Sequence, residues 1–79
     1  MIEEFDYIYL DPPYAFHEYE RLFSLIEESG VLKQDGIIIV EVHKDTVLDE
    51  NYGKMLQYKV KNYGINKLLY YRRSGGSQS

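Results

Sequence analysis

The feature that most restricts the fold of this chain is the run Ile37–Val42, which reads Ile-Ile-Ile-Val-Glu-Val. It is rich in β-branched residues and lacks the polar alternation of a strand with one exposed face. Such a run indicates a central strand that is covered on both faces, as in a parallel sheet. The stretch Phe5–Leu10 is also apolar at most positions, with Asp6 as its single charge, and it predicts a second strand of this kind.

A helix is predicted between these two strands, from His17 to Ser29. Gly30 stands where a glycine commonly ends a helix, and Lys33–Gly36 is expected to form a turn. Strand, helix and strand in this order predict a right-handed βαβ unit with two parallel strands. The apolar residues of the helix recur at helical spacing and form one stripe, made of Tyr19, Leu22, Phe23 and Ile26.

The last third of the chain predicts a β-hairpin. Leu56–Lys61 alternates between apolar and mostly basic residues, and Lys67–Arg73 is a second strand-like segment. The connection at 62–66 contains a turn glycine, so the two strands are expected to pair antiparallel. Before the hairpin, Asp45 or Thr46 is expected to cap a short helical turn through residue 50, and residues 51–53 are expected to form a loop.

Length and composition fit one small α/β domain at residues 1–73, followed by a flexible tail at residues 74–79. The net charge of −4 argues against binding nucleic acid by phosphate neutralisation alone. The absence of cysteine excludes disulfides and thiolate metal ligands, and no metal site is predicted. Since the chain has no apolar run of membrane-spanning length and its start does not resemble a signal peptide, a cytoplasmic location is expected.

The residues Asp11-Pro12-Pro13-Tyr14 follow the first predicted strand and precede the helix. In open α/β sheets the carboxyl end of a strand is where ligands bind. The two prolines fix φ and lack N–H donors, so this stiff corner offers carbonyl oxygens and one carboxylate beside an aromatic ring. These properties suit a planar group that carries an amine. An ordinary strand-ending turn is the alternative interpretation, because Asp-Pro commonly opens turns.

His43 follows the second predicted strand and is therefore expected at the same edge of the sheet. It is a candidate general base or base-contacting residue. A solvated histidine without a functional role is the more frequent situation in a loop.

The motif and the order of elements resemble the C-terminal half of a class I S-adenosylmethionine-dependent methyltransferase, a Rossmann-like fold. In such enzymes an (Asp/Asn)-Pro-Pro-(Tyr/Phe) motif marks methylation of the exocyclic amines of nucleobases. More narrowly, Phe5–Tyr14, Gly36–Glu41 and Leu68–Arg73 resemble the RsmD family of bacterial methyltransferases, which modify the N2 amine of a guanine in 16S ribosomal RNA. The similarity covers nearly all of the chain up to Arg73.

The resemblance implies catalytic roles for the four motif residues. Asp11 and the carbonyl of Pro12 would accept the two N–H bonds of the guanine amine. Pro13 would keep the corner rigid, and Tyr14 would stack on the base. Asp11 would also border the S-adenosylmethionine site, and the implied partner is ribosomal RNA or the small ribosomal subunit.

The chain departs from this family in what it lacks. It has no glycine-rich loop to hold the cofactor and no room for three strands before Phe5. It is therefore expected to be the C-terminal half of a longer enzyme, inactive alone, with the missing N-terminal half as a partner. The open edge of Phe5–Leu10 is expected to favour self-association.

Two other functions remain open at this point. An adenine-N6 methyltransferase of DNA or RNA uses a similar tetrapeptide, although Asp11 in place of Asn and the match beyond the motif favour the guanine enzyme. A non-catalytic α/β module, kept for binding or assembly, is the other alternative. The absence of a cofactor-binding half supports that module for the isolated chain.

Overall fold

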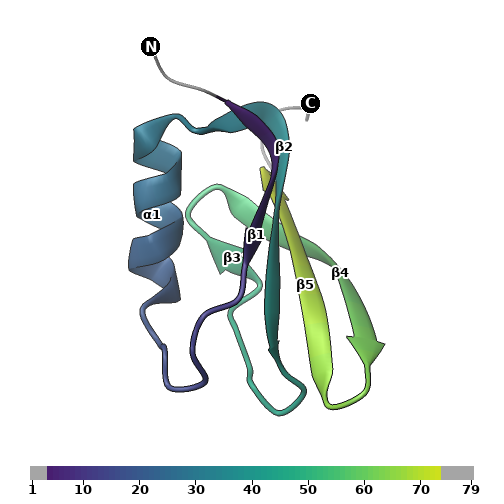
Figure 1. Cartoon of the computed structure of the whole chain (residues 1–79). Helices are drawn as coiled ribbons and strands as arrows, with labels where there is room; N and C mark the ends of the chain where they lie inside the picture. The colour runs from purple at the N-terminus through teal and green to yellow at the C-terminus, as the bar shows by residue number, and fades with distance from the viewer. Residues whose placement is uncertain (1–3, 74–79) are drawn as a thin grey trace.

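The computed structural model describes residues 4–73, which form a five-stranded sheet with one helix on one face (Figure 1). The strands follow the order β1-β2-β5-β4-β3 in the sheet. The tail predicted at residues 74–79 lies outside the described residues. The elements in chain order are β1 (Phe5–Leu10), α1 (Tyr19–Ser29), β2 (Leu32–His43), β3 (Asn51–Tyr52), β4 (Met55–Tyr63) and β5 (Asn66–Arg73).

The βαβ unit predicted from the sequence is confirmed, because β1 and β2 are parallel neighbours joined by α1. Their register pairs Ile8 with Ile38 and Leu10 with Val40, so these apolar residues share one face of the sheet. The predicted stripe of α1 is buried or half-buried against the same face. Gly30 ends the helix with a left-handed φ of 74°, in agreement with its predicted role.

The helix begins later than the sequence predicted, at Tyr19 instead of His17. The residues before it form a separate turn, in which the N–H of Phe16 donates to the carbonyl of Pro13 at 2.9 Å. The residues of this turn therefore do not join the helix, and α1 starts after them.

The turn predicted at Lys33–Gly36 is wrong, because these residues lie inside β2. They form an irregular part of the strand, where the register moves from Phe5 opposite Leu32 to Tyr7 opposite Ile37. A short step along β1 is thus matched by a longer stretch of β2. The polar, glycine-containing sequence forms a bulge-like irregularity here without ending the strand.

Close packing at Gly36 and hydrogen bonds from Arg73 hold the irregular segment in place. Gly36 is buried, and a Cβ there would lie 2.4 Å from Cδ1 of Leu32, so a side chain does not fit without a shift. The Arg73 guanidinium donates to the carbonyls of Leu32 at 3.2 Å and Gln34 at 2.9 Å. Arg73 also forms an ion pair of 3.1 Å with Glu27, which ties the segment to β5 and to α1.

The predicted hairpin is confirmed by the antiparallel pairing of β4 with β5. Its connection is shorter than predicted, since only Gly64 and Ile65 separate the two strands. Gly64 has a φ of 57°, and a glycine at the first position of a two-residue turn suits the twist of the flanking strands.

No helical turn follows β2, contrary to the prediction that Asp45 or Thr46 caps one. The N–H of Thr46 instead closes a turn on the carbonyl of His43 at 2.9 Å. Farther along, the N–H of Asp49 donates to the hydroxyl of Tyr52 at 2.9 Å, so the segment is held by the core and not by helical bonds. Tyr52 belongs to the short strand β3, where the sequence predicted a loop.

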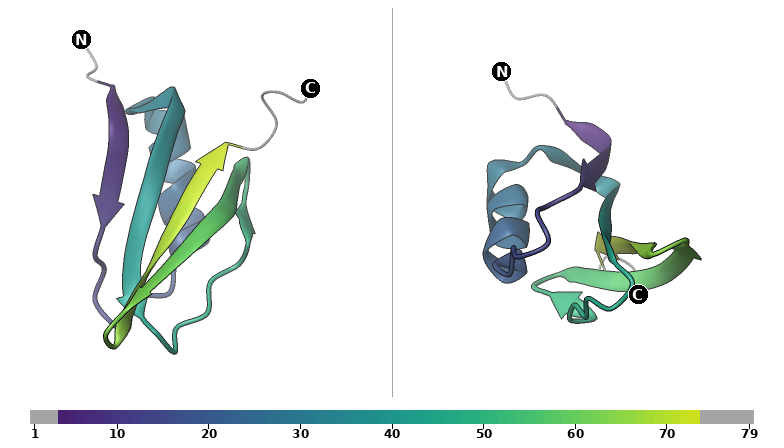
Figure 2. Two further views of the ribbon diagram at one scale, coloured as in Figure 1. Left: turned by 90° about the vertical axis from the view of Figure 1, so that its right-hand side faces the viewer. Right: turned by 60° about the horizontal axis from the view of Figure 1, so that its bottom comes forward.

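The core lies between α1 and one face of the sheet, while the described residues leave the other face open (Figure 2). The buried rings of Phe23, Tyr52 and Tyr71 have centroids 4.8 to 5.8 Å apart. On the open face, Tyr7 and Tyr9 are 65% and 56% exposed. The sequence predicted β1 to be covered on both faces, and within residues 4–73 only one is covered. In this part of the chain no helix has the length and apolar content needed to cross a membrane.

Candidate functional site

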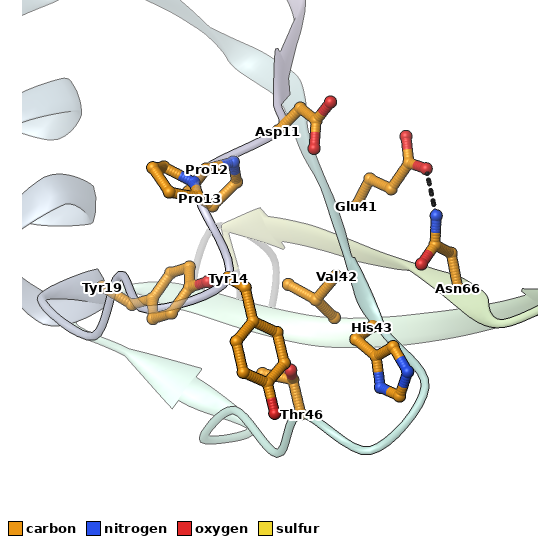
Figure 3. Close-up of a pocket in the computed structure, with 10 residues that line it drawn as sticks. All are labelled: Asp11, Pro12, Pro13, Tyr14, Tyr19, Glu41, Val42, His43, Thr46 and Asn66. Atoms are coloured by element: carbon orange, nitrogen blue, oxygen red, sulfur yellow. Dashed lines mark hydrogen bonds between the residues drawn. The ribbon is translucent and has the colours of Figure 1, made fainter.

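A pocket of about 240 Å³ opens at the edge of the sheet where β1 and β2 end (Figure 3). One side comes from the connection after β1 and the start of α1, and consists of Asp11, Pro12, Pro13, Tyr14 and Tyr19. The other side comes from β2, the loop after it and the start of β5, and consists of Glu41, Val42, His43, Thr46 and Asn66. All four motif residues, together with His43, therefore line one pocket.

The proline corner offers oxygen acceptors at this pocket. Within residues 4–73 the exposed Asp11 carboxylate has no hydrogen-bond or ion-pair partner. The carbonyl of Pro13 accepts the N–H of Phe16, whereas the carbonyl of Pro12 accepts no backbone hydrogen bond in the same part of the chain. Prolines contribute no competing N–H. The corner thus has a carboxylate and a carbonyl that can both accept hydrogen bonds from a ligand.

Tyr14 and His43 meet across the pocket. The ring of Tyr14 is 79% exposed, and its centroid lies 5.9 Å from that of His43 with the planes at 88°. Nδ1 of His43 accepts the backbone N–H of Asp45 at 3.1 Å, so this nitrogen is already in use. Tyr14 can therefore stack on a flat ligand, while the position of His43 suits an edge contact better than proton transfer through Nδ1.

The Glu41 carboxylate, which the sequence analysis did not single out, accepts three hydrogen bonds at the pocket. The donors are the hydroxyl of Tyr9, the hydroxyl of Tyr63 at 2.9 Å and the side-chain amide of Asn66 at 2.9 Å. They come from β1, β4 and β5, so one side chain of β2 connects three other strands. These bonds hold the pKa of Glu41 below its ordinary value, and the bond to Glu41 raises the pKa of Tyr9 to about 12.

Two carboxylates, Asp11 and Glu41, give the pocket an acidic character. Ionised carboxylates accept hydrogen bonds and cannot donate them, so the pocket favours ligands that present N–H groups or positive charge. Within residues 4–73, no group of three or more His, Cys, Asp or Glu side chains is placed to hold a metal ion.

A sequence signal for Glu41 existed, because it is the only charged residue in the apolar run Ile37–Val42. A charge near the carboxyl end of a buried strand is costly unless it is paired or functional. Tyr9, Tyr63 and Asn66 carried no such signal. They converge on Glu41 only through the pairing of strands that are distant in sequence.

Comparison with known proteins identifies relatives over most of the chain. The family model described as "Conserved hypothetical protein 95" matches residues 2–72. YlbH of Bacillus subtilis, whose name assigns it provisionally to the rRNA methyltransferases, is 32% identical over 68 residues, which are 86% of this chain and 37% of that protein. Ribosomal RNA small subunit methyltransferase D of Haemophilus influenzae is 43% identical over 44 residues, 56% of this chain and 23% of that protein.

A solved structure from Haemophilus influenzae, titled provisionally as a methylase, is similar with a TM-score of 0.70 and 33% identity, over 91% of this chain and 44% of that one. This similarity, and the parallel β1–β2 pair followed by antiparallel strands, confirm the Rossmann-like class I methyltransferase fold. The chain spans less than half the length of each of these relatives. It belongs to the Conserved hypothetical protein 95 family, the RsmD family that its motifs resemble.

Proposed function

We propose that this chain supplies the base-binding and catalytic corner of a methyltransferase that modifies the N2 amine of a guanine in 16S ribosomal RNA. Its family and the name of the Haemophilus influenzae relative support ribosomal RNA as the substrate class. The observation that carries the finer proposal is the Asp11 carboxylate, which has no partner among residues 4–73, beside the Pro12 carbonyl, which accepts no backbone hydrogen bond in this part of the chain. The exposed ring of Tyr14 lines the same pocket.

In this proposal the corner activates a weak nucleophile. The amine nitrogen of guanine is a poor nucleophile because its lone pair is delocalised into the ring. Asp11 and the Pro12 carbonyl accept its two N–H bonds, which turns the nitrogen toward tetrahedral geometry and directs the lone pair at the methyl donor. Asp11 also stabilises the positive charge that develops on nitrogen during transfer. The proton then leaves to Asp11 or to water.

The aromatic and proline residues position the base. Tyr14 stacks on the ring, which is worth about 1–3 kcal/mol per base in comparable sites. Pro13 limits movement of the corner, and its carbonyl is fixed by the hydrogen bond from Phe16. A rigid corner matters because small displacements of reacting groups reduce the rate strongly.

S-adenosylmethionine is the proposed methyl donor. When bound, it would supply the methyl group of its sulfonium. The residues present fit one border of its site, because the Asp11 carboxylate at the pocket would supply negative charge toward a cationic sulfonium. Asp11 is the residue of this chain proposed to border the cofactor. The sequence contains no G-x-G loop, so most of the cofactor contacts are proposed to come from outside this chain.

We further propose that the chain works with an N-terminal half and is inactive without it. Within residues 4–73, β1 pairs only with β2, and Tyr7 and Tyr9 of β1 are exposed. The chain also covers only 23% to 44% of the three relatives described above. An open apolar edge favours pairing with another segment, and in the isolated chain it favours self-association. The proposed substrate places the activity in the cytoplasm.

The test is a methylation assay with the full-length protein, small ribosomal subunits and labelled S-adenosylmethionine, followed by nucleoside analysis. N2-methylguanosine is the expected product, and the 79-residue chain alone should give none. N6-methyladenosine would instead assign the protein to the adenine-modifying enzymes. Cofactor binding without any methyl incorporation into subunits or naked 16S RNA would refute the enzymatic proposal.

A further inference from the structure

Glu41 lies beside Asp11 at the pocket, and the proposed mechanism gives it no step. Both residues line the pocket (Figure 3), and each directly follows one member of the Leu10–Val40 pair of β1 and β2, so they occupy neighbouring positions along the two parallel segments. The charge of Asp11 also contributes to the raised pKa values of Tyr9 and Tyr63, the two hydroxyls that bond to Glu41. Two neighbouring carboxylates favour a ligand edge that carries adjacent N–H donors.

The hydrogen bonds to Glu41 leave it one free acceptor position. A carboxylate has about four lone-pair sites. Within residues 4–73, Oε2 accepts from Tyr63 and Asn66, whereas Oε1 accepts only from Tyr9. One site on Oε1 therefore remains. The three donors also favour the ionised form, so Glu41 acts as an acceptor and not as a donor.

We infer that Glu41 accepts the N1–H of the guanine whose N2 amine is bound by Asp11, and that it thereby selects guanine over purines that lack this hydrogen. The inference rests on the proposed function. Guanine presents N1–H and the N2 amine side by side on its Watson–Crick edge. Adenine has a lone pair at N1, which would face a fixed negative charge.

The arrangement of donors makes Glu41 suited to discrimination. Because Tyr9, Tyr63 and Asn66 fix the carboxylate, it cannot turn away from a base that offers it no hydrogen. A site built to accept a particular N–H rejects analogues that lack it, since its polar group is then left unpaired. A purely structural role, in which Glu41 only joins strands, predicts no such selectivity.

The experiment compares three ribonucleotides as ligands of the full-length protein, measured by calorimetry or by competition. Guanosine monophosphate carries both groups. The 2-aminopurine nucleotide keeps the amine but has a lone pair at N1, and inosine monophosphate keeps N1–H but lacks the amine. Loss of one hydrogen bond to a charged group predicts binding of the 2-aminopurine nucleotide that is at least about tenfold weaker than that of guanosine monophosphate.

Two variants separate recognition from structure. In Glu41→Gln the new side-chain amide can donate to the N1 lone pair, so the preference for guanosine over 2-aminopurine should collapse or reverse. Tyr63→Phe is the matched control, because it removes one bond to Glu41 and leaves the carboxylate in place. Tyr9 and Asn66 still hold the carboxylate in that variant, so it should keep most of the preference even if it lowers stability.

The outcomes distinguish this inference from the proposed function. Equal binding of guanosine and 2-aminopurine nucleotides by the unmodified protein overturns the role of Glu41, whether or not Glu41→Gln folds. A folded Glu41→Gln protein that keeps the full preference does the same. Equal binding of inosine and guanosine nucleotides instead overturns the proposed recognition of the amine by Asp11. Absence of binding by all three overturns both.

Discussion

The hydroxyl of Tyr71 offers a stability test whose size follows from the structure. Tyr71 is fully buried, and its hydroxyl donates to the carbonyl of Asp49 at 2.7 Å and accepts from the side-chain amide of Gln57 at 3.0 Å. Tyr71→Phe keeps the ring and its contact with Phe23 but leaves both partners without this bond. A typical hydrogen bond contributes about 0.5–1.5 kcal/mol to stability, so the loss of both bonds should lower the free energy of unfolding by about 2 kcal/mol.

The assay is chemical denaturation followed by circular dichroism, with the slope against denaturant compared between proteins. Tyr70→Phe is the matched control, because this neighbour lies on the opposite face and its hydroxyl has no hydrogen bond within residues 4–73. Its ring contacts with Tyr58 and Lys59 survive the change, so its effect should stay within about 0.5 kcal/mol. Equal stability of Tyr71→Phe and the unmodified protein, or equal losses in both variants, would refute the reasoning.

Four further predictions concern acid titration, alkaline titration, packing and stacking. The lowered pKa of Glu41 adds stability that is present above its unfolded-state pKa and is lost as the pH falls through the folded-state value. Tyr9→Phe removes one hydrogen bond that lowers this pKa, so the variant should lose less stability in an acid titration. In the same variant, the loss of stability between about pH 10 and pH 12 that follows from the raised pKa of Tyr9 should disappear. Gly36→Ala should lower the free energy of unfolding by about 1–3 kcal/mol, measured by thermal unfolding, because the added Cβ would clash with Leu32. An unchanged melting temperature would show that Leu32 or the backbone moves to accept the methyl group. Tyr14→Ala should weaken RNA binding by about 1–3 kcal/mol while Tyr14→Phe should be mild, and equal damage by both would exclude stacking as the role of this ring.

The main elements of the fold could be predicted because their signals are local. The apolar runs of β1 and β2, the stripe of α1 and the alternation of β4 each appear within a few consecutive residues. One error occurred where distant contacts decide the conformation. Lys33–Gly36 stays in β2 because Arg73 and the register with β1 hold it there.

The candidate site likewise contains residues that local sequence patterns predict and residues that they do not. Asp11 and Tyr14 were visible because the proline corner is a short, specific motif at a strand end, and the structure brings both to one pocket. The surroundings of Glu41 were not visible, because its three donors approach it from three strands and only the sheet order unites them. Sequence patterns therefore located the proline corner and His43, and strand pairing brought together the groups around Glu41.

The proposed mechanism depends most on the hydrogen bonds that Asp11 and Pro12 are proposed to make with the amine of the base. The most direct test measures methyl transfer by the full-length Asp11→Ala protein, with cofactor affinity measured separately by calorimetry and folding checked by circular dichroism. We predict that turnover is lost while the cofactor still binds, because the carboxylate acts mainly on the base. Near-normal methyl transfer by a folded Asp11→Ala protein would contradict the account.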